Sequence, residues 1–497
     1  MGFSTEQKFW NLLKEQSSFE EAIGLMAWDM RTKAPKKGIE NRSEVIGVLS
    51  EKVHEIQTCD EIKHYIDELK QTASDPKLIA ALRETEETYH RTNKIPTQLY
   101  KEFVTLQTTA ESKWAEAKEQ NDFEGFQPYL KELVRYNREF AELWGYEDNI
   151  YDALLHNYEP GVTVKQLDQV FPKVRDELAA LLTKIQDSKI SPDPAILQGH
   201  FPKQSQEAFS EEILKRMNYD FEAGRLDETI HPFAIGLNTN DVRVTTKYDE
   251  RDFRTAVFGT IHEGGHALYE QNIDSDLSFT PLATGTSMGI HESQSLFWEN
   301  FIARSREFWE NHYSLFQSYA PDRFKQVSFD DFFLAVNEVK PSLIRIEADE
   351  LTYCLHIMVR YELEKALING EIEVEQLPEL WNEKMATYLG VVPDSDSTGV
   401  LQDIHWAGGD FGYFPSYALG YMYAAQINNA MRKDVNVPAA VRSGDFQLIK
   451  TWLSDRIHQY GKMKKPLEIL EEVTGEGLNP DDLVTYLRNK YKLIYQF

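Results

Sequence analysis

The sequence predicts a mostly α-helical protein. Apolar side chains recur at intervals of three and four residues along most of the chain, which is the spacing of a helix with one buried face. The alternation typical of a strand occurs in one short segment, Asp241–Thr246, so we expect only minor β-structure. No stretch rich in proline, glycine and serine divides the chain. We therefore expect one large helical domain over residues 1–497, arranged as two lobes around a cleft.

Individual segments show how this expectation arises along the chain. Apolar side chains step by three or four residues through Leu99–Trp114, after a proline that suits the first turn of a helix. The strand-like segment Asp241–Thr246 is followed by a helical stripe over Ala256–Tyr269. Leu483–Ile494 repeats the helical spacing near the C-terminus. Loops rich in glycine, proline and aspartate are expected at Val391–Gly399 and Trp406–Pro415.

The composition limits the class of protein. The formal net charge of −28 argues against nucleic acid or anionic membranes as partners, because both require a basic surface. A hydrophobic content of 41% with 12% aromatic residues excludes a disordered chain. The two cysteines, Cys59 and Cys354, lie far apart, which fits a reducing compartment and excludes a cysteine-based zinc site. We find no signal sequence and no apolar run of membrane-spanning length, so we expect a soluble, cytoplasmic protein.

The most informative feature is the pentapeptide His-Glu-Gly-Gly-His at His262–His266. Residues four apart share one face of a helix, so His262 and His266 can each direct one imidazole nitrogen at a single metal ion. Glu263 is close enough to act on a water molecule there without being a ligand. This H-E-x-x-H arrangement is typical of zinc metallopeptidases and predicts a hydrolase.

The alternative interpretation is a surface helix with two incidental histidines. An apolar stripe upstream of the motif indicates a packed helix instead, formed by Phe253, Ala256, Val257, Thr260 and Ile261. Gly264 and Gly265 are unusual, since each glycine costs a helix interior about 1 kcal/mol relative to alanine. We interpret the two glycines as room for a substrate backbone beside the metal.

A catalytic zinc site needs a third protein ligand and leaves the fourth position to water. A third histidine in the H-E-x-x-H-x-x-G-x-x-H pattern is excluded, because Tyr269 and Asn272 occupy the matching positions. The other common source is a glutamate on a following helix. Glu292 is the best candidate for this ligand, and its neighbour His291 is the rival.

The helix predicted to carry Glu292 begins at that residue and continues over residues 292–302 with apolar periodicity. Two other acidic residues are weaker candidates for the third ligand. Glu270 is too close to His266 on the same helix, and Glu299 is less suitably placed.

The predicted chemistry follows from these ligands. Zinc lowers the pKa of a bound water molecule from 15.7 towards about 7, and Glu263 would accept its proton and pass it to the leaving amine. Peptide bonds are the natural target. An enzyme that cuts at a chain end must also bind a terminal charge, and Arg243 and Arg345 are candidates for holding a carboxylate through paired hydrogen bonds. Spacing alone leaves both arginines open to the alternative that they are solvated surface residues.

Motifs beyond the pentapeptide occur in order along essentially the whole chain. They are Trp28-Asp29 with Thr32, Pro35 and Arg42; His231-Pro232-Phe233; D-x-R-x-T at Asp241–Thr245; His291-Glu292-Ser293; I-R-x-x-A-D at Ile344–Asp349; G-x-x-Q-D-x-H-W at Gly399–Trp406; and the aromatic loop Gly412–Tyr417. With these motifs the chain resembles the M32 family of metallocarboxypeptidases, the carboxypeptidase Taq type, and departs from the family pattern at none of them.

The resemblance implies a two-lobed helical fold with a deep central groove, related to neurolysin and angiotensin-converting enzyme. It also implies a homodimer. The implied activity is stepwise release of single amino acids from peptide C-termini, with broad specificity and poor release of C-terminal proline. The implied cofactor is one divalent metal ion per subunit, zinc or cobalt.

The resemblance also implies a role for each matching residue. The metal ligands would be His262, His266 and Glu292, with Glu263 as general base and acid. The residues facing the substrate carboxylate would be Arg243 and Arg345, and we expect Asp241 and Asp349 to orient these arginines as ion-pair partners. The residues lining the site and supporting the oxyanion would be His231, His405 and Tyr417, with Tyr413, Tyr421 and Tyr423 as alternatives to the last.

Two other functions fit parts of the sequence. The same metal site could serve an endo-oligopeptidase of the neurolysin type, which needs no free C-terminus. The chain could also be a non-catalytic helical protein that binds peptides, although such a protein has no need for Glu263.

Overall fold

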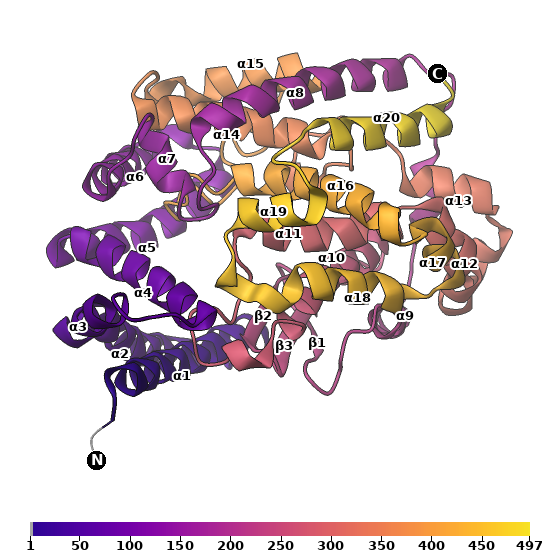
Figure 1. Ribbon diagram of the computed structural model, residues 1–497. Coiled ribbons are helices and arrows are strands. Elements are labelled where there is room, and N and C mark those ends of the chain that lie inside the picture. Colours follow the sequence, from indigo (N-terminus) through magenta and orange to yellow (C-terminus); the bar gives the residue numbers. More distant parts are fainter. Residues whose placement is uncertain (1–2) are drawn as a thin grey trace. The chain divides into compact units, whose positions relative to one another are not determined.

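A computed structural model shows the fold of residues 3–497 (Figure 1). The chain forms two compact units, each assembled from segments that are distant in sequence. Helices predominate in both units, which confirms the predicted fold class. Within residues 3–497, none of the helices is both long enough and apolar enough to cross a membrane.

The first unit contains the residues up to Asn93, Pro194–Val336 and Ile427–Gly475. Its helices are α1 (Thr5–Thr32), α2 (Ile39–Thr58), α3 (Asp60–Leu69), α4 (Pro76–Lys94), α9 (Lys203–Arg216), α10 (Arg254–Gln271), α11 (Met288–Leu296), α12 (Arg306–Tyr319), α13 (Phe329–Val336), α17 (Val437–Ser443), α18 (Phe446–Arg456) and α19 (Pro466–Thr474). Strands β1 (Leu226–Glu228), β2 (Ala234–Asn238) and β3 (Asp241–Thr246) complete the unit.

The three strands form one sheet in the order β1-β3-β2, which lies beside α10 (Figure 1). Strand β1 runs parallel to β3, and β2 runs antiparallel to it. The predicted strand is confirmed as β3, with the expected bounds. The sequence did not reveal β1 and β2, because segments of three and five residues are too short for alternation to stand out.

Helix α10 carries the His-Glu-Gly-Gly-His motif and is held from two sides. At its start, Phe253 packs against a buried aromatic cluster. Its ring is tilted against that of Phe316, with 4.7 Å between the two ring centres. Along its length, the buried Thr260 hydroxyl donates to the Thr246 hydroxyl of β3 at 3.0 Å. These contacts fix which face of α10 carries the histidines.

Helix α11 begins earlier than the sequence predicted. It starts at Met288 rather than at Glu292, because the Ser287 hydroxyl accepts a hydrogen bond from the Ile290 N–H and caps the helix there. The helix then continues as a π-helical segment over Phe297–Ala303. This places Glu292 in the second turn of α11, and it places Glu299 in the wider π-helical turn.

The second unit contains Lys94–Asp193, Asn337–Gln426 and the residues from Glu476 onward. Its helices are α5 (Thr97–Gln120), α6 (Phe123–Trp144), α7 (Ile150–Leu155), α8 (Val164–Gln186), α14 (Tyr353–Asn369), α15 (Leu377–Leu389), α16 (Pro415–Asp434), whose C-terminal part belongs to the first unit, and α20 (Asp481–Tyr495). The helices predicted over Leu99–Trp114 and Leu483–Ile494 are confirmed as parts of α5 and α20.

A buried carboxylate holds the loop between α15 and α16 in the second unit. Glu364 of α14 accepts hydrogen bonds from the Tyr151 hydroxyl at 2.6 Å, the Trp406 indole at 2.7 Å and the Gly412 N–H at 3.1 Å. Burial raises the pKa of Glu364 to about 7, although these donors oppose the rise. The loop that carries His405 is therefore fixed from the core.

The two glycines of α10 at positions 259 and 265 give a matched test of the packing. A Cβ atom at Gly265 would lie 2.6 Å from the Gln294 carbonyl oxygen, whereas one at Gly259 would meet only Thr246 Oγ1 at 3.9 Å. We expect Gly265→Ala to lower the free energy of unfolding by about 1–3 kcal/mol. Gly259→Ala should raise it by up to about 1 kcal/mol, since alanine favours helix.

Urea denaturation followed by circular dichroism measures both variants. Equal effects of the two substitutions would show that α10 and α11 do not approach as closely as the structure indicates.

Candidate functional site

Two helices of the first unit bring three candidate metal ligands together. Within residues 3–497, His262, His266 and Glu292 are the group whose ligand atoms all lie within 4.8 Å of one another in a geometry suited to a metal. The Glu292 Oε2 atom is 3.4 Å from His266 Nε2 and 3.7 Å from His262 Nε2. Helix α10 supplies the histidines and α11 supplies the glutamate.

These separations fit a bound divalent ion. Four ligands arranged tetrahedrally around zinc at 2.0–2.2 Å lie roughly 3.4 Å from one another. Both imidazoles present Nε2 to the same carboxylate oxygen, so one ion can contact all three atoms. The sequence reasoning selected the same three residues.

The other nitrogen of His262 is held by an ion-paired carboxylate. His262 Nδ1 lies 2.9 Å from Glu299 Oε2, and Arg304 donates to Glu299 Oε1 at 2.9 Å. Burial would raise the pKa of Glu299, but His262 and Arg304 lower it below its usual value. Glu299, which the sequence made a weak ligand candidate, thus orients the candidate ligand His262 instead.

The other nitrogen of His266 is held by a second histidine. His266 Nδ1 lies 2.6 Å from His291 Nδ1, and His291 Nε2 lies 2.9 Å from Glu270 Oε1. His291 was the rival for the third ligand, but its ring lies between His266 and Glu270. Burial would raise the pKa of Glu270, yet hydrogen bonds, that from His291 above all, lower it below its usual value.

Glu263 lies beside the ligand group but outside it. Its side chain is buried, with the residue 8% exposed. Burial raises the pKa of Glu263 to about 7, and the adjacent His262 opposes part of that rise. A carboxylate with a pKa near neutrality is suited to accept and return a proton at pH 7.

The paired glycines serve helix packing rather than substrate access, which corrects our interpretation of the sequence. A Cβ atom at Gly265 would lie 2.6 Å from the backbone of α11. A Cβ atom at Gly264 would lie 2.7 Å from Leu214 Cδ2 and 3.1 Å from Met217 Cε. Both positions face neighbouring protein, so the missing side chains bring helices together and leave no space for a peptide.

Arg243 is fixed in place on strand β3. Its Nε and Nη2 atoms donate to the two oxygens of Asp241, each at 2.7 Å, as the sequence led us to expect. Its guanidinium also lies over the indole of Trp28 in α1, with 4.5 Å between the guanidinium carbon and the ring centre. His231 is exposed in the loop before β2.

In the second unit, Arg345 belongs to a buried charged cluster. Its Nε and Nη2 atoms donate to Asp403 Oδ1 at 3.0 and 2.9 Å, and Arg360 Nε donates to Asp403 Oδ2 at 2.7 Å. Gln402 Oε1 accepts from the Arg345 N–H and from Arg360. Burial would raise the pKa of Asp403, but the two arginines hold it far below its usual value.

Asp349 does not pair with Arg345, which corrects the expected ion pair. Its carboxylate instead accepts hydrogen bonds from the N–H groups of Lys340, Leu351 and Thr352 and from the Thr352 hydroxyl. Burial raises its pKa to about 6. Asp349 is close to Arg345 in the sequence, which suggested the pair, but its carboxylate stabilises its own turn. Arg345 pairs with Asp403 instead.

His405 and Tyr417 meet in the second unit. His405 Nε2 lies 3.2 Å from the Tyr417 hydroxyl, and the His405 ring packs 4.4 Å from that of Phe414. Burial, together with the charge of Arg345, lowers the pKa of His405 to about 4, so the ring is neutral at pH 7. Of the alternative tyrosines, Tyr421 and Tyr423 are fully buried.

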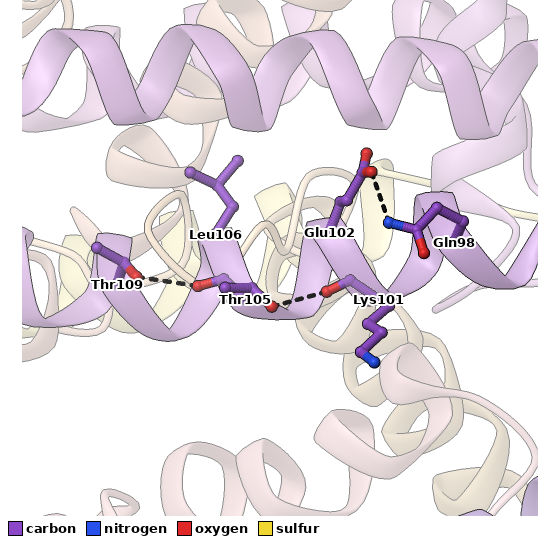
Figure 2. A pocket seen from close by; sticks show the side chains of 6 residues that line it. All are labelled: Gln98, Lys101, Glu102, Thr105, Leu106 and Thr109. Atoms are coloured by element: carbon purple, nitrogen blue, oxygen red, sulfur yellow. Dashed lines mark hydrogen bonds between the residues drawn. The ribbon is translucent and has the colours of Figure 1, made fainter.

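A shallow depression of about 430 Å³ on α5 of the second unit is the site drawn in Figure 2. It is lined by Gln98, Lys101, Glu102, Thr105, Leu106 and Thr109. The Gln98 amide donates to Glu102, and both threonine hydroxyls donate to carbonyls of the same helix. Glu102 also accepts from the Tyr136 hydroxyl of α6, so most polar groups here already have partners, and the depression carries no functional argument.

The whole chain matches one family of known proteins. A model of the Carboxypeptidase Taq (M32) metallopeptidase family matches residues 8–491. Carboxypeptidase 1 of Bacillus subtilis is 52% identical over 495 residues, which cover 99% of this chain and 98% of that protein. Thermostable carboxypeptidase 1 of Thermus thermophilus is 41% identical over 514 residues, covering 99% of each. The crystal structure of M32 carboxypeptidase from Deinococcus radiodurans has a TM-score of 0.96 at 32% identity, over 99% of this chain and 100% of that one.

The ligand group on α10 and α11, together with these matches, defines a metallopeptidase. The chain belongs to the M32 family of metallocarboxypeptidases, as its motifs predicted. It is therefore a hydrolase of the metallocarboxypeptidase class, and the family implies a divalent metal ion.

Asp403 offers a test of the buried cluster in the second unit. Asp403→Asn leaves the guanidinium groups of Arg345 and Arg360 buried without a counter-charge, so the free energy of unfolding should fall by about 3–5 kcal/mol. The matched control is Glu177→Gln, which breaks an exposed pair with Arg488 and should cost less than about 1 kcal/mol. Denaturant titration measures both.

The pH dependence of this effect has a defined sign. The pKa of Asp403 is depressed in the folded state, so its stabilisation is complete above the unfolded pKa of about 3.9 and is lost as the pH falls towards the folded value. The difference between wild type and Asp403→Asn should therefore shrink below about pH 4. A difference that grows in acid would contradict the assigned ion pairs.

Proposed function

We propose that the protein is a zinc-dependent carboxypeptidase that releases single amino acids stepwise from peptides with a free C-terminus. We further propose broad specificity and poor release of C-terminal proline, as the family resemblance implies. The observation that carries the proposal is the convergence of His262, His266 and Glu292 beside the buried Glu263. Two histidines and one glutamate are the donor set of zinc hydrolases, with cobalt as the alternative metal.

A metal ion at these ligands supplies Lewis acidity and lowers the pKa of water. Glu263 is then the proton carrier: it takes a proton from the attacking water molecule and delivers it to the leaving amine. Its raised pKa supports this role, because a carboxylate near pH 7 can both accept and release a proton. Glu299 and Arg304 keep His262 oriented throughout.

Recognition of the substrate carboxylate requires local positive charge in a chain of net charge −28. We assign this task to Arg243 and Arg345, supported by Asp241 and Asp403 respectively. Each arginine is held in one orientation before substrate arrives, which reduces the entropy lost on binding. We assign His231, His405 and Tyr417 to support of the oxyanion, and this assignment rests on the family motifs.

Three further proposals concern the setting of the enzyme. We propose a homodimer in the cytoplasm that acts on peptides and has neither nucleic acid nor membrane as a partner. The negative net charge supports the last two exclusions. Light scattering of the purified protein tests the dimer.

The proposed activity predicts a ladder of products. A defined peptide should lose one C-terminal residue at a time in a mass-spectrometric time course, and removal of the metal with a chelator should stop the reaction. The same peptide with an amidated C-terminus should remain intact. Internal fragments, or cleavage of the amidated peptide, would instead indicate an endo-oligopeptidase.

Glu263→Gln is the matched variant for this assay. It keeps the shape of the side chain and removes its basicity, so it should retain the metal and form no ladder, with a loss of activity of at least about 100-fold. Metal content by atomic spectroscopy is the control. Turnover near that of wild type would overturn the mechanism, and a metal-bound, peptide-binding but inactive wild type would favour a non-catalytic binding protein.

Arg243 has a matched control in Arg225. Both guanidinium groups lie over Trp28, at 4.5 and 5.2 Å, and each pairs with an aspartate two residues away. Arg243→Gln should raise KM for free-acid peptides by about 10- to 100-fold, as expected for a lost charged hydrogen bond, and should change kcat less. Arg225→Gln should leave both constants unchanged. Steady-state kinetics that show equal shifts for the two variants would remove Arg243 from substrate recognition.

A further inference from the structure

Three side chains form a continuous hydrogen-bonded line that ends at a metal ligand. His266 Nδ1 lies 2.6 Å from His291 Nδ1, and His291 Nε2 lies 2.9 Å from Glu270 Oε1. Glu270 is buried and also accepts from the Gly285 N–H at 2.9 Å and the Thr284 hydroxyl at 3.2 Å. The line therefore begins at the ligand group and ends at a carboxylate that the backbone holds in place.

The position of each proton along this line follows from the geometry. His266 presents Nε2 to Glu292 Oε2 at 3.4 Å, so a metal ligand there requires a bare Nε2 and a proton on Nδ1. Two ring nitrogens 2.6 Å apart need one donor and one acceptor, so His291 Nδ1 must accept. The proton of His291 then resides on Nε2 and is donated to Glu270.

The surroundings of His291 fit one ring orientation. A Cβ atom at Gly285 would lie 2.6 Å from His291 Cδ2, so the ring occupies space that only glycine leaves open at this position. On another side, the Tyr269 ring packs at 5.1 Å from the imidazole. The ring is thus confined to the orientation that joins His266 to Glu270.

We propose that His291 is a positioning residue that, with Glu270, holds His266 in the tautomer able to bind the metal. The inference rests on the ligand set proposed above. It makes the two histidine ligands unequal: His262 is oriented directly by a carboxylate, whereas His266 is oriented through a neutral imidazole. Removal of the acceptor at position 291 leaves the His266 Nδ1–H without its hydrogen-bond partner, which weakens binding of the metal.

Two substitutions at this position separate hydrogen bonding from packing, because leucine and asparagine have nearly the same shape. His291→Asn introduces an amide oxygen that can take the place of the imidazole Nδ1, so it keeps an acceptor for the His266 Nδ1–H. His291→Leu removes the acceptor. A matched control for packing is His458→Leu. Like His291, His458 packs on the Tyr269 ring at 5.1 Å, and it bonds to Gln294 of α11, but it contacts no ligand.

The experiment measures zinc affinity of the metal-free protein by competition with a chromogenic chelator, with circular dichroism to verify the fold of each variant. His291→Leu should bind zinc about 10- to 100-fold more weakly than wild type. His291→Asn should recover most of that loss, and His458→Leu should bind zinc like wild type. Zinc affinity of His291→Leu within about twofold of wild type, or equal losses in His291→Leu and His291→Asn, would overturn the proposal.

A spectroscopic measurement tests the tautomers directly. In the zinc-loaded protein with ¹⁵N-labelled histidine, long-range ¹H–¹⁵N correlations should place the proton of His266 on Nδ1 and that of His291 on Nε2. A proton on His291 Nδ1 would overturn the proposal even if the variants behave as expected.

These readouts are independent of peptidase activity. Wild-type protein that binds zinc but cuts internal bonds would refute the carboxypeptidase proposal and leave the role of His291 standing. Wild-type protein that binds no zinc would overturn the ligand set and this inference together.

Discussion

The close approach of α10 and α11 is the constraint on which the metal centre depends. Gly265 lies against the backbone of Gln294 and Ser295, where any side chain would collide. This contact brings Glu292, less than one turn away on α11, within 3.4 Å of His266 Nε2. Neither helix holds the ligand set alone. A glycine that is unfavourable for an isolated helix thus makes the third ligand available.

A second constraint on the first unit is the negative charge that it buries. Glu263, Glu270, Glu292 and Glu299 are all buried or nearly so, and Arg304 offsets only one of them directly. Buried carboxylates are costly without compensating charge or hydrogen bonds. A divalent cation at the two histidines and Glu292 would supply that compensation, and binding of the metal and stability of this region would then be coupled. Burial raises the pKa of Glu263, and the charge of Glu292 adds to the rise, which is the property its proposed role requires.

Much of this organisation could be predicted from the sequence. Features that depend on local spacing were predictable, whereas contacts that depend on tertiary packing were not. The spacing of His262 and His266 is local, so helix periodicity alone places them on one face. The pairing of Asp241 with Arg243, two residues apart on one strand, was predictable for the same reason. The partners of the histidines could not be assigned, because their roles depend on how α10, α11 and the π-helical turn pack. Likewise, the true partner of Arg345 comes from a distant loop that the buried Glu364 anchors.

The two arginines differ in what they can still bind. Arg345 directs Nε and Nη2 to Asp403 and Nη1 to the Tyr353 hydroxyl, so each of its three nitrogens already donates a hydrogen bond. Arg243 directs Nε and Nη2 to Asp241 and stacks its face on Trp28. A guanidinium recognises a carboxylate best through two parallel N–H bonds from one edge. The edge formed by Nη1 and Nη2 of Arg243 is the better suited to that task, and its stacked, paired geometry means that little side-chain freedom remains to be lost when a carboxylate binds.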